Sequence, residues 1–315
     1  MHEDPGNLPV STWPEGSAVG SVKNDVRPDI QPVSKGLSGT WETEDLDLGA
    51  YLRRIGYDGP LDSTSGTLRA LQRAHVDAIA FENVDVVLRR GVSLETADLQ
   101  RKLVDAGRGG YCFEHNLLFA AALERLGFPV TRFLARVRRG SGRIRYRAHA
   151  VLVVEADGRR WLADAGFGDE GLLAPVPLAA GSGVEAGAWR WRVAAEDDQW
   201  VLQSLHEDGW FDLYSFREER HFPADFEVSN YYTAHSERST FTGPLIAMRG
   251  TEDARHLLRG RELTTSFPSG RSERAELTGE EAMSALRDLF RIRLTAEEES
   301  LLLRHETAMP PAGNR

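Results

Sequence analysis

Three residues of this chain carry side chains that could act together in nucleophilic catalysis: Cys112, His149 and Asp164. Cys112 is the only cysteine among the 315 residues, and it follows a Gly-Gly-Tyr turn where a predicted helix begins. A thiol at a helix N-terminus is biased toward the reactive thiolate by the helix dipole and by unpaired N–H groups. A lone cysteine is more often a small, inert core side chain, so whether Cys112 is a nucleophile depends on the side chains near it.

His149 and Asp164 lie on the two arms of a predicted β-hairpin. Apolar runs flank Asp157-Gly158, which is a strong hairpin signal. A turn centred there pairs His149 with Gly166 and Asp164 with Val151, unless a β-bulge shifts the register. Side chains alternate along a strand, so His149 and Asp164 should share a face as diagonal neighbours, ~7–8 Å apart. Such a pair can also simply satisfy a polar position in a core.

A thiol changes the interpretation of the His–Asp pair. A cysteine attacks as thiolate, a histidine holds and returns the proton, and an aspartate fixes the histidine tautomer and stabilises its charged form. The chain order Cys, His, Asp also matches papain-like sites, in which the closeness of the three side chains in space cannot be deduced from sequence. The three residues therefore predict a catalytic triad.

The bulk composition limits the class of protein. The chain is 41% hydrophobic and 27% charged, as expected for a soluble globular protein of two or three subdomains. It shows no apolar run of the ~18 residues that a membrane helix needs and no secretory signal. The single cysteine then favours a reducing cytoplasm. The net charge of −10 argues against a dedicated nucleic-acid binder.

The elements that position the three residues follow in a clear order. Residues 1–40 are rich in Pro, Gly, Ser and Asp and are expected to be a flexible extension. Helices are expected over 62–76, 93–104 and from Cys112 to a stop at Gly127. Short strands should follow over 130–137, 145–155, 160–165, 189–193, 200–205 and 210–216. Beyond residue 230 the pattern is mixed, with capping boxes Thr278-x-x-Glu281 and Thr295-x-x-Glu298 opening two helices. The fold class is α+β: a helical bundle, an antiparallel sheet or barrel, then a small mixed segment.

Several motifs, all in order between residues 41 and 295, resemble those of the arylamine N-acetyltransferase family, of the actinobacterial type. Segment 108–116, Arg-Gly-Gly-Tyr-Cys-Phe-Glu-His-Asn, is similar to the family's nucleophile motif. Segment 80–85 resembles its Pro-Phe-Glu-Asn-Leu box, and segment 164–168 resembles its Asp-Val-Gly-Phe-Gly motif. Segment 228–241 resembles its Asn…Ser-Thr-His-Pro…Phe stretch. Ala80 and Ser236 replace family prolines, and His115 stands where many members carry Leu or Gln.

The resemblance implies an organisation and a site. It implies a helical bundle with the nucleophile over 41–127, a β-barrel with His and Asp over 128–227, and an α/β lid with C-terminal helices over 228–315. Cys112, His149 and Asp164 would be the triad. The substrate-binding residues would be Phe81, Tyr111, Phe167 and Gly168.

The activity implied is acetyl transfer from acetyl-CoA, a co-substrate rather than a bound cofactor, to a small arylamine or arylhydrazine in xenobiotic metabolism. It would run through an acyl-cysteine by double displacement, in an enzyme that is a possible homo-oligomer. An amide synthase of the same fold that closes a polyketide macrolactam would use the same triad. A thiol hydrolase and a binding protein with a buried Cys112 are further alternatives.

Other signals compete with these interpretations. Segment 166–171 fits G-x-G-x-x-G, but Pro175 and Pro177 prevent the helix that a dinucleotide site requires, so the loop is better explained by close substrate approach. His75, His115 and His235 match no zinc spacing, so no metal is expected, and His115 should be a polar helix-surface residue. A run of arginines is either a solvated hairpin, which is slightly favoured, or an attractor for the phosphates of coenzyme A: Arg132, Arg136, Arg138, Arg139, Arg143, Arg145 and Arg147.

Overall fold

The computed structural model describes residues 41–141 and 143–308, which belong to one compact unit, Ser38–Arg315. The predicted flexible extension over residues 1–40 lies outside the described residues. No helix in the described ranges is both long enough and apolar enough to cross a bilayer. The division into parts at residues 127 and 227 stays a prediction.

The first part of the described chain is helical and centres on one buried helix. The elements are α1 (Leu48–Ile55), α2 (Ser65–Ala78), α3 (Val84–Val87), α4 (Thr96–Leu99), a π-helical turn (Gln100–Asp105) and α5 (Cys112–Arg125). Helix α2 begins where the Thr64 hydroxyl accepts the N–H of Thr67. The helix predicted over 93–104 begins only at Thr96, as α4, and continues as the π-helical turn to Asp105. Helix α5 is buried on every side from Cys112 to Leu123, not along a single stripe.

The central part is an eight-stranded antiparallel sheet in the order β5-β4-β3-β2-β9-β8-β7-β6. Its strands are β2 (Val130–Val137), β3 (His149–Ala156), β4 (Arg159–Ala163), β5 (Val176–Pro177), β6 (Gly183–Ala186), β7 (Trp189–Glu196), β8 (Gln199–His206) and β9 (Gly209–Phe216). Edge strand β5 contacts β6 and β7, so the sheet is a nearly closed barrel. The strand predicted from residue 145 begins only at His149, since residues 143–148 form a loop.

A second sheet, built mainly from the C-terminal part, was missed by the sequence patterns. It has five strands in the order β1-β10-β11-β12-β13: β1 (Phe81–Glu82), β10 (Ile246–Gly250), β11 (Arg255–Arg259), β12 (Glu262–Ser266) and β13 (Ser272–Glu276). Strands β12 and β13 carry mostly polar and charged residues, β12 is half-buried and β13 is exposed, so no apolar alternation marked them. Helix α6 (Pro223–His235) precedes this sheet and was also missed.

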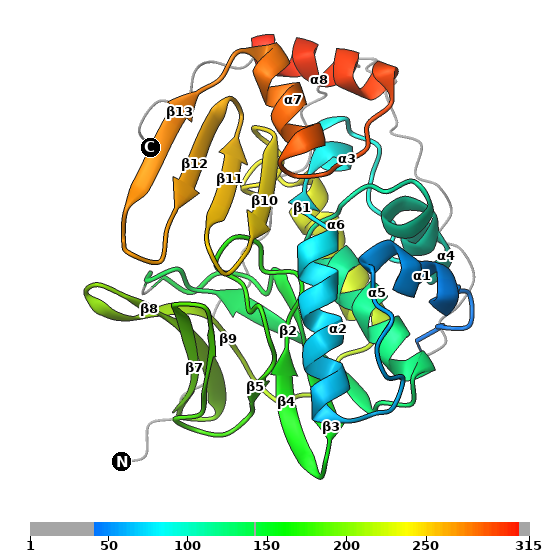
Figure 1. The fold of residues 1–315 in the computed structure, drawn as a ribbon, viewed down its shortest axis with the longest axis vertical. Helices are drawn as coiled ribbons and strands as arrows, with labels where there is room; N and C mark the ends of the chain where they lie inside the picture. Colours follow the sequence, from blue (N-terminus) through cyan, green and yellow to red (C-terminus); the bar gives the residue numbers. More distant parts are fainter. Residues whose placement is uncertain (1–40, 142, 309–315) are drawn as a thin grey trace, which may run out of the picture. The chain divides into compact units, whose positions relative to one another are not determined.

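The two C-terminal helices begin where their capping boxes predicted. Helix α7 (Gly279–Asp288) starts with reciprocal hydrogen bonds between Thr278 and Glu281, and α8 (Ala296–Ala308) with the same pattern between Thr295 and Glu298. Figure 1 shows α7 and α8 beside the five-stranded sheet, and α2 and α5 alongside both sheets. Helix α5 packs on β3, and α2 packs on β10. The helix start that carries Cys112 is thereby held against the barrel strand that carries His149.

Candidate active site

Cys112 is the first residue of α5 and is buried, with 3% of its surface exposed. The helix start is fixed because the Glu114 carboxylate accepts the N–H of Tyr111 at 3.0 Å. The thiol donates a hydrogen bond to the carbonyl of Ala148 at 3.4 Å, one residue before His149 in the chain. Among the described residues no hydrogen bond joins Sγ to the imidazole ring of His149.

His149 and Asp164 form a direct, buried pair. The imidazole Nε2–H donates to Asp164 Oδ2 at 2.7 Å, and both residues are at most 2% exposed. The hairpin register predicted from the Asp-Gly turn is confirmed over the ladder from Leu152–Ala163 to Ala156–Arg159. This alternation brings the two side chains to one face, as the sequence predicted. Nδ1 is the ring nitrogen left to accept a proton.

Asn116, one turn after Cys112 on α5, holds the carboxylate in place. Its Nδ2 donates to Asp164 Oδ1 at 2.9 Å and to the Ala150 carbonyl at 2.7 Å, while its Oδ1 accepts the Ala165 N–H at 2.9 Å. The N–H of Gly166 also donates to Asp164 Oδ1 at 2.9 Å. Asn116 therefore ties α5 to both arms of the hairpin. The sequence reasoning missed this role, although its spacing of one helical turn from Cys112 was a usable signal.

The pKa shifts describe the resting charges of the site. Burial raises the pKa of Asp164, but His149, Asn116 and the Gly166 N–H outweigh burial and hold this pKa below its ordinary value. Burial raises the pKa of the Cys112 thiol well above its usual range, and the nearby N–H of Ala150 only partly offsets this. The helix start alone therefore does not give a thiolate here.

At two glycines the backbone passes close to other groups in and around the site. A Cβ on Gly166 would lie 2.8 Å from the Cys112 carbonyl and 2.9 Å from Asn116 Nδ2. Gly168 has φ +99°, and a Cβ there would lie 2.4 Å from the Met248 sulfur. The loop 166–171 leads to β5 with no helix, so the structure lacks the context of a dinucleotide site.

A small cavity of about 20 Å³ lies beside the carboxylate. Phe81, Phe167 and Gly168 line it, together with His115 and Met248. Phe167 also packs edge-on to the His149 ring, with 5.1 Å between centroids. Three of the four predicted substrate-binding residues thus lie at one cavity next to Asp164.

Tyr111, the fourth predicted substrate-binding residue, is not among the residues lining this cavity. Its side chain is fully buried, its hydroxyl hydrogen-bonds Asn230 Oδ1, and its ring packs edge-on to Phe241. Phe241 in turn contacts Phe81 at 5.6 Å between ring centroids. Tyr111 therefore stands behind the cavity wall.

Comparison with known proteins places this arrangement in a family. A family model described as N-acetyltransferase matches residues 64–299. The arylamine N-acetyltransferase of Mycolicibacterium smegmatis is 39% identical over 224 residues, 69% of this chain and 82% of that protein. The chain belongs to the arylamine N-acetyltransferase family.

Solved structures of this family share the fold. The Nocardia farcinica arylamine N-acetyltransferase has a TM-score of 0.79 and 42% identity, and the match covers 84% of this chain and 95% of that one. The Mycobacterium marinum arylamine N-acetyltransferase in complex with CoA has a TM-score of 0.78 and 34% identity, covering 82% and 98%. This chain is accordingly an acyltransferase by family.

One histidine of this family member lies differently from the sequence expectation. His115 is buried, with 1% exposed, so the prediction of a helix-surface residue is wrong. Its Nδ1 pairs with His75 Nε2 at 3.0 Å, and the chain of hydrogen bonds continues to the Tyr51 hydroxyl and the Ala80 carbonyl. Burial lowers the pKa of His115 to about 4, so this histidine is neutral. In the described ranges no group of three His, Cys, Asp or Glu side chains could hold a metal ion.

Proposed function

We propose that this chain transfers an acetyl group from acetyl-CoA to a small arylamine or arylhydrazine through an acetyl-Cys112 intermediate. The observation that carries the proposal is the buried His149–Asp164 pair, next to a thiol that hydrogen-bonds the residue preceding His149. The fold of a CoA-complexed relative supports CoA as the carrier of the acetyl group.

In the first half-reaction the thiol proton moves to His149 Nδ1, and Sγ attacks the thioester carbonyl. The N–H groups in the first turn of α5 have no partner inside the helix and can stabilise the oxyanion. The C–S bond to CoA then breaks, and the CoA sulfur takes the proton from His149. The Nε2 bond to Asp164 stabilises the imidazolium while it carries this proton.

In the second half-reaction the amine nitrogen attacks the acetyl carbonyl of Cys112. His149 accepts the proton that the nitrogen loses, the C–Sγ bond breaks, and Sγ recovers the proton. Arylamines are neutral near pH 7, so they reach the acyl-enzyme ready to attack. Burial of Cys112 shields the thioester from water, which disfavours the hydrolase alternative.

The cavity beside Asp164 is small, and neither Cys112 nor His149 is among the residues that line it. A volume of about 20 Å³ is little more than a water molecule needs. We propose that Phe81, Phe167 and Gly168 surround the methyl group of the acetyl and that Tyr111 supports Phe81 through Phe241. A polyketide chain, as in the macrolactam alternative, would need the site to open widely. The cytoplasmic location and the homo-oligomer stay predictions.

The test is intact-mass analysis after brief incubation with acetyl-CoA. We expect one acetyl adduct that maps to Cys112 and disappears when an arylamine is added. Cys112→Ser should show no adduct under the same conditions. An undiminished adduct in Cys112→Ser, or none in the wild type with a folded protein, would refute the proposal.

A further inference from the structure

Three buried side chains that the proposed reaction does not use form a continuous chain of hydrogen bonds beside the site. Tyr51 of α1, His75 of α2 and His115 of α5 are each at most 1% exposed. The Tyr51 hydroxyl lies 2.8 Å from His75 Nδ1, and His75 Nε2 lies 3.0 Å from His115 Nδ1. His115 Nε2 in turn lies 3.2 Å from the carbonyl oxygen of Ala80, the residue before β1. We call Tyr51, His75 and His115 the histidine chain.

Only one arrangement of protons satisfies the histidine chain when both rings are neutral. The Ala80 carbonyl can only accept, so His115 Nε2 carries a proton and donates to it, and His115 Nδ1 is bare. The Nε2–H of His75 must then donate to that bare nitrogen, which leaves His75 Nδ1 to accept from the Tyr51 hydroxyl. Every donor therefore points toward Ala80, and each histidine is fixed in one tautomer by its neighbours.

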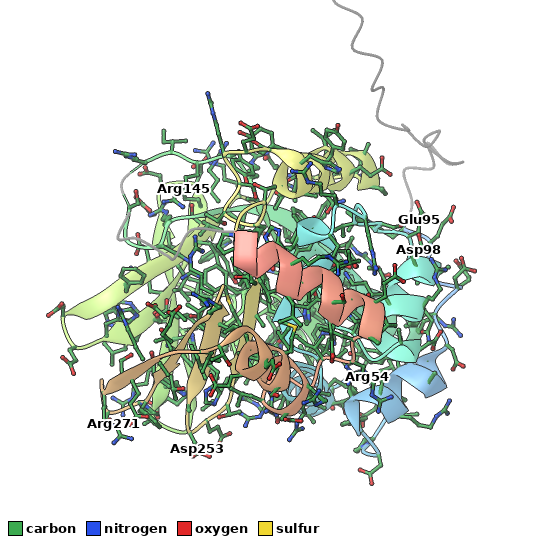
Figure 2. The ribbon with its side chains drawn as sticks, turned by 90° about the horizontal axis from the view of Figure 1, so that it is seen from above. Arg54, Glu95, Asp98, Arg145, Asp253 and Arg271 are labelled. Carbon is green, nitrogen blue, oxygen red and sulfur yellow. The ribbon has the colours of Figure 1, made fainter. Side chains whose placement is uncertain are left out.

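The surroundings of the two rings keep them neutral. Burial lowers the pKa of both histidines, that of His115 to about 4. The neighbouring His115 and the charge of Arg54 lower the pKa of His75 further, and Figure 2 labels Arg54 at α1. An extra proton on His115 Nδ1 would force His75 to turn its own proton toward Tyr51. The hydroxyl hydrogen of Tyr51 would then lose its acceptor in a buried setting, so the neutral arrangement is the one that leaves every donor of the chain paired.

The histidine chain ends on the segment that carries one wall of the small cavity. Phe81 follows Ala80 directly, and its ring lies nearly parallel to the His115 ring, with 7° between the planes and 6.3 Å between the centroids. Both rings line the cavity. The Glu82 N–H also donates to the carbonyl of Gly110 at 2.8 Å, just before the start of α5. The segment 80–82 is therefore held to α5 and its approach by one backbone hydrogen bond and by the His115 ring.

We propose that His115 is a positioning residue that fixes Phe81 relative to Cys112 and so limits the size of the acyl group. His75 and Tyr51 hold the His115 ring in the orientation and tautomer that this requires. The inference rests on the proposed function, in which Phe81 surrounds the acetyl methyl group, and it names what fixes that wall. If the chain acted on stability alone, its loss would slow acylation of Cys112 by every donor to the same degree. A positioning role instead changes the selectivity among donors.

The kinetic test compares His115→Leu with His115→Gln. Leucine cannot donate to the Ala80 carbonyl, whereas the amide of glutamine can. The measured quantity is the rate of Cys112 acylation by 4-nitrophenyl acetate divided by the rate with 4-nitrophenyl butyrate, because a loss of folded protein lowers both rates equally. We expect His115→Leu to lower this ratio about tenfold, within the selectivity that one methylene commands in a pocket, and His115→Gln to keep it near the wild-type value. An unchanged ratio in folded His115→Leu, or equal losses in the two variants, would overturn the proposal.

The far end of the histidine chain supplies a variant that leaves the cavity lining intact. Tyr51→Phe removes the donor to His75, and Tyr51 is not among the residues that line the cavity. Tyr57→Phe is the matched control, because it removes a hydroxyl just after α1 that donates to the Pro60 carbonyl instead. We expect the acetate-to-butyrate ratio to fall about threefold in Tyr51→Phe, as the loss of one hydrogen bond predicts, and to stay at the wild-type value in Tyr57→Phe. The same ratio in both variants would overturn the role of the chain.

Nitrogen-15 spectroscopy separates this inference from the proposed function. The protein is labelled with nitrogen-15 histidine, and proton–nitrogen correlations through two bonds report which ring nitrogen carries the proton. The signals of the two rings are assigned with His75→Gln and His115→Gln. We expect both rings to be neutral near pH 7, with the proton on Nε2. A charged ring, or a proton on Nδ1 of either ring, would refute the histidine chain. These spectra need no acyl donor, so an absence of acetyl transfer from acetyl-CoA would refute the proposed function and leave this result standing.

Discussion

Replacing Asn116 with alanine should damage stability and catalysis together, because one amide serves three groups. Asn116→Ala removes the bonds to Asp164 Oδ1, the Ala150 carbonyl and the Ala165 N–H. Asp164 keeps the Gly166 N–H and His149 on its two oxygens. The two backbone groups lose the partner that Asn116 gave them in a buried setting. A buried polar group without a partner costs about 1–3 kcal/mol, so we expect the free energy of unfolding to fall by about 2–6 kcal/mol.

The catalytic effect follows from Asp164. The carboxylate loses one donor that lowers its pKa, so this pKa should rise and the His149 ring should be held less firmly. A positioned acid–base group contributes about 10²–10⁴-fold, and we expect about a tenfold part of this to be lost in the rate of Cys112 acylation. Urea unfolding followed by tryptophan fluorescence measures the stability, and the burst of 4-nitrophenol from 4-nitrophenyl acetate measures acylation.

Leu123→Ala on the same helix is the matched control. Leu123 is fully buried on α5, and its truncation should cost about 2–5 kcal/mol of stability. It touches none of the bonds around Asp164, so acylation per folded molecule should stay at the wild-type rate. The reasoning is refuted if Asn116→Ala unfolds with wild-type free energy, or if its acylation rate per folded molecule equals that of Leu123→Ala.

Three further outcomes follow from the site. Gly166→Ala places a methyl group 2.8 Å from the Cys112 carbonyl, so it should abolish the acylation burst and lower Tm. The control Gly243→Ala, with open space around its Cβ position, should leave both the burst and Tm unchanged. A normal burst in Gly166→Ala contradicts the packing argument. His149→Gln removes the group proposed to take the thiol proton, while burial still raises the pKa of the thiol, so the pH profile of iodoacetamide alkylation should move to higher pH. An unmoved profile means that His149 does not support the thiolate. The folded-state pKa of Asp164 is depressed, so its contribution to the free energy of unfolding is present above the unfolded pKa of about 3.9 and is lost as pH falls through the folded pKa. Asp164→Asn should therefore flatten the acid limb of the stability curve, and an unchanged limb would count against the assignment.

The His149–Asp164 pair could be predicted from sequence because its determinants are local. An Asp-Gly turn sets the register, and strand alternation then decides the face on which each side chain lies. The capping boxes at Thr278 and Thr295 were equally readable, since each involves a contact only three residues away. Short-range geometry is encoded in short stretches of sequence.

Contacts between distant segments could not be read in this way. Strands β12 and β13 bury too little apolar surface to show an alternating pattern, so they appear only once β12 pairs with β11 and β13 pairs with β12. The burial of His115 depends on His75, forty residues earlier, which completes its hydrogen bonds.

The sequence by itself determined the candidate nucleophile, the register of its His–Asp partners and the family motifs. Only the tertiary structure decided how these groups are charged and held. Packing of α5 against β3 buries the Cys112 thiol and raises its pKa, and the same packing lets Asn116 bind Asp164. Desolvation and long-range hydrogen bonds are properties of the assembled core, so no local pattern of residues could specify them.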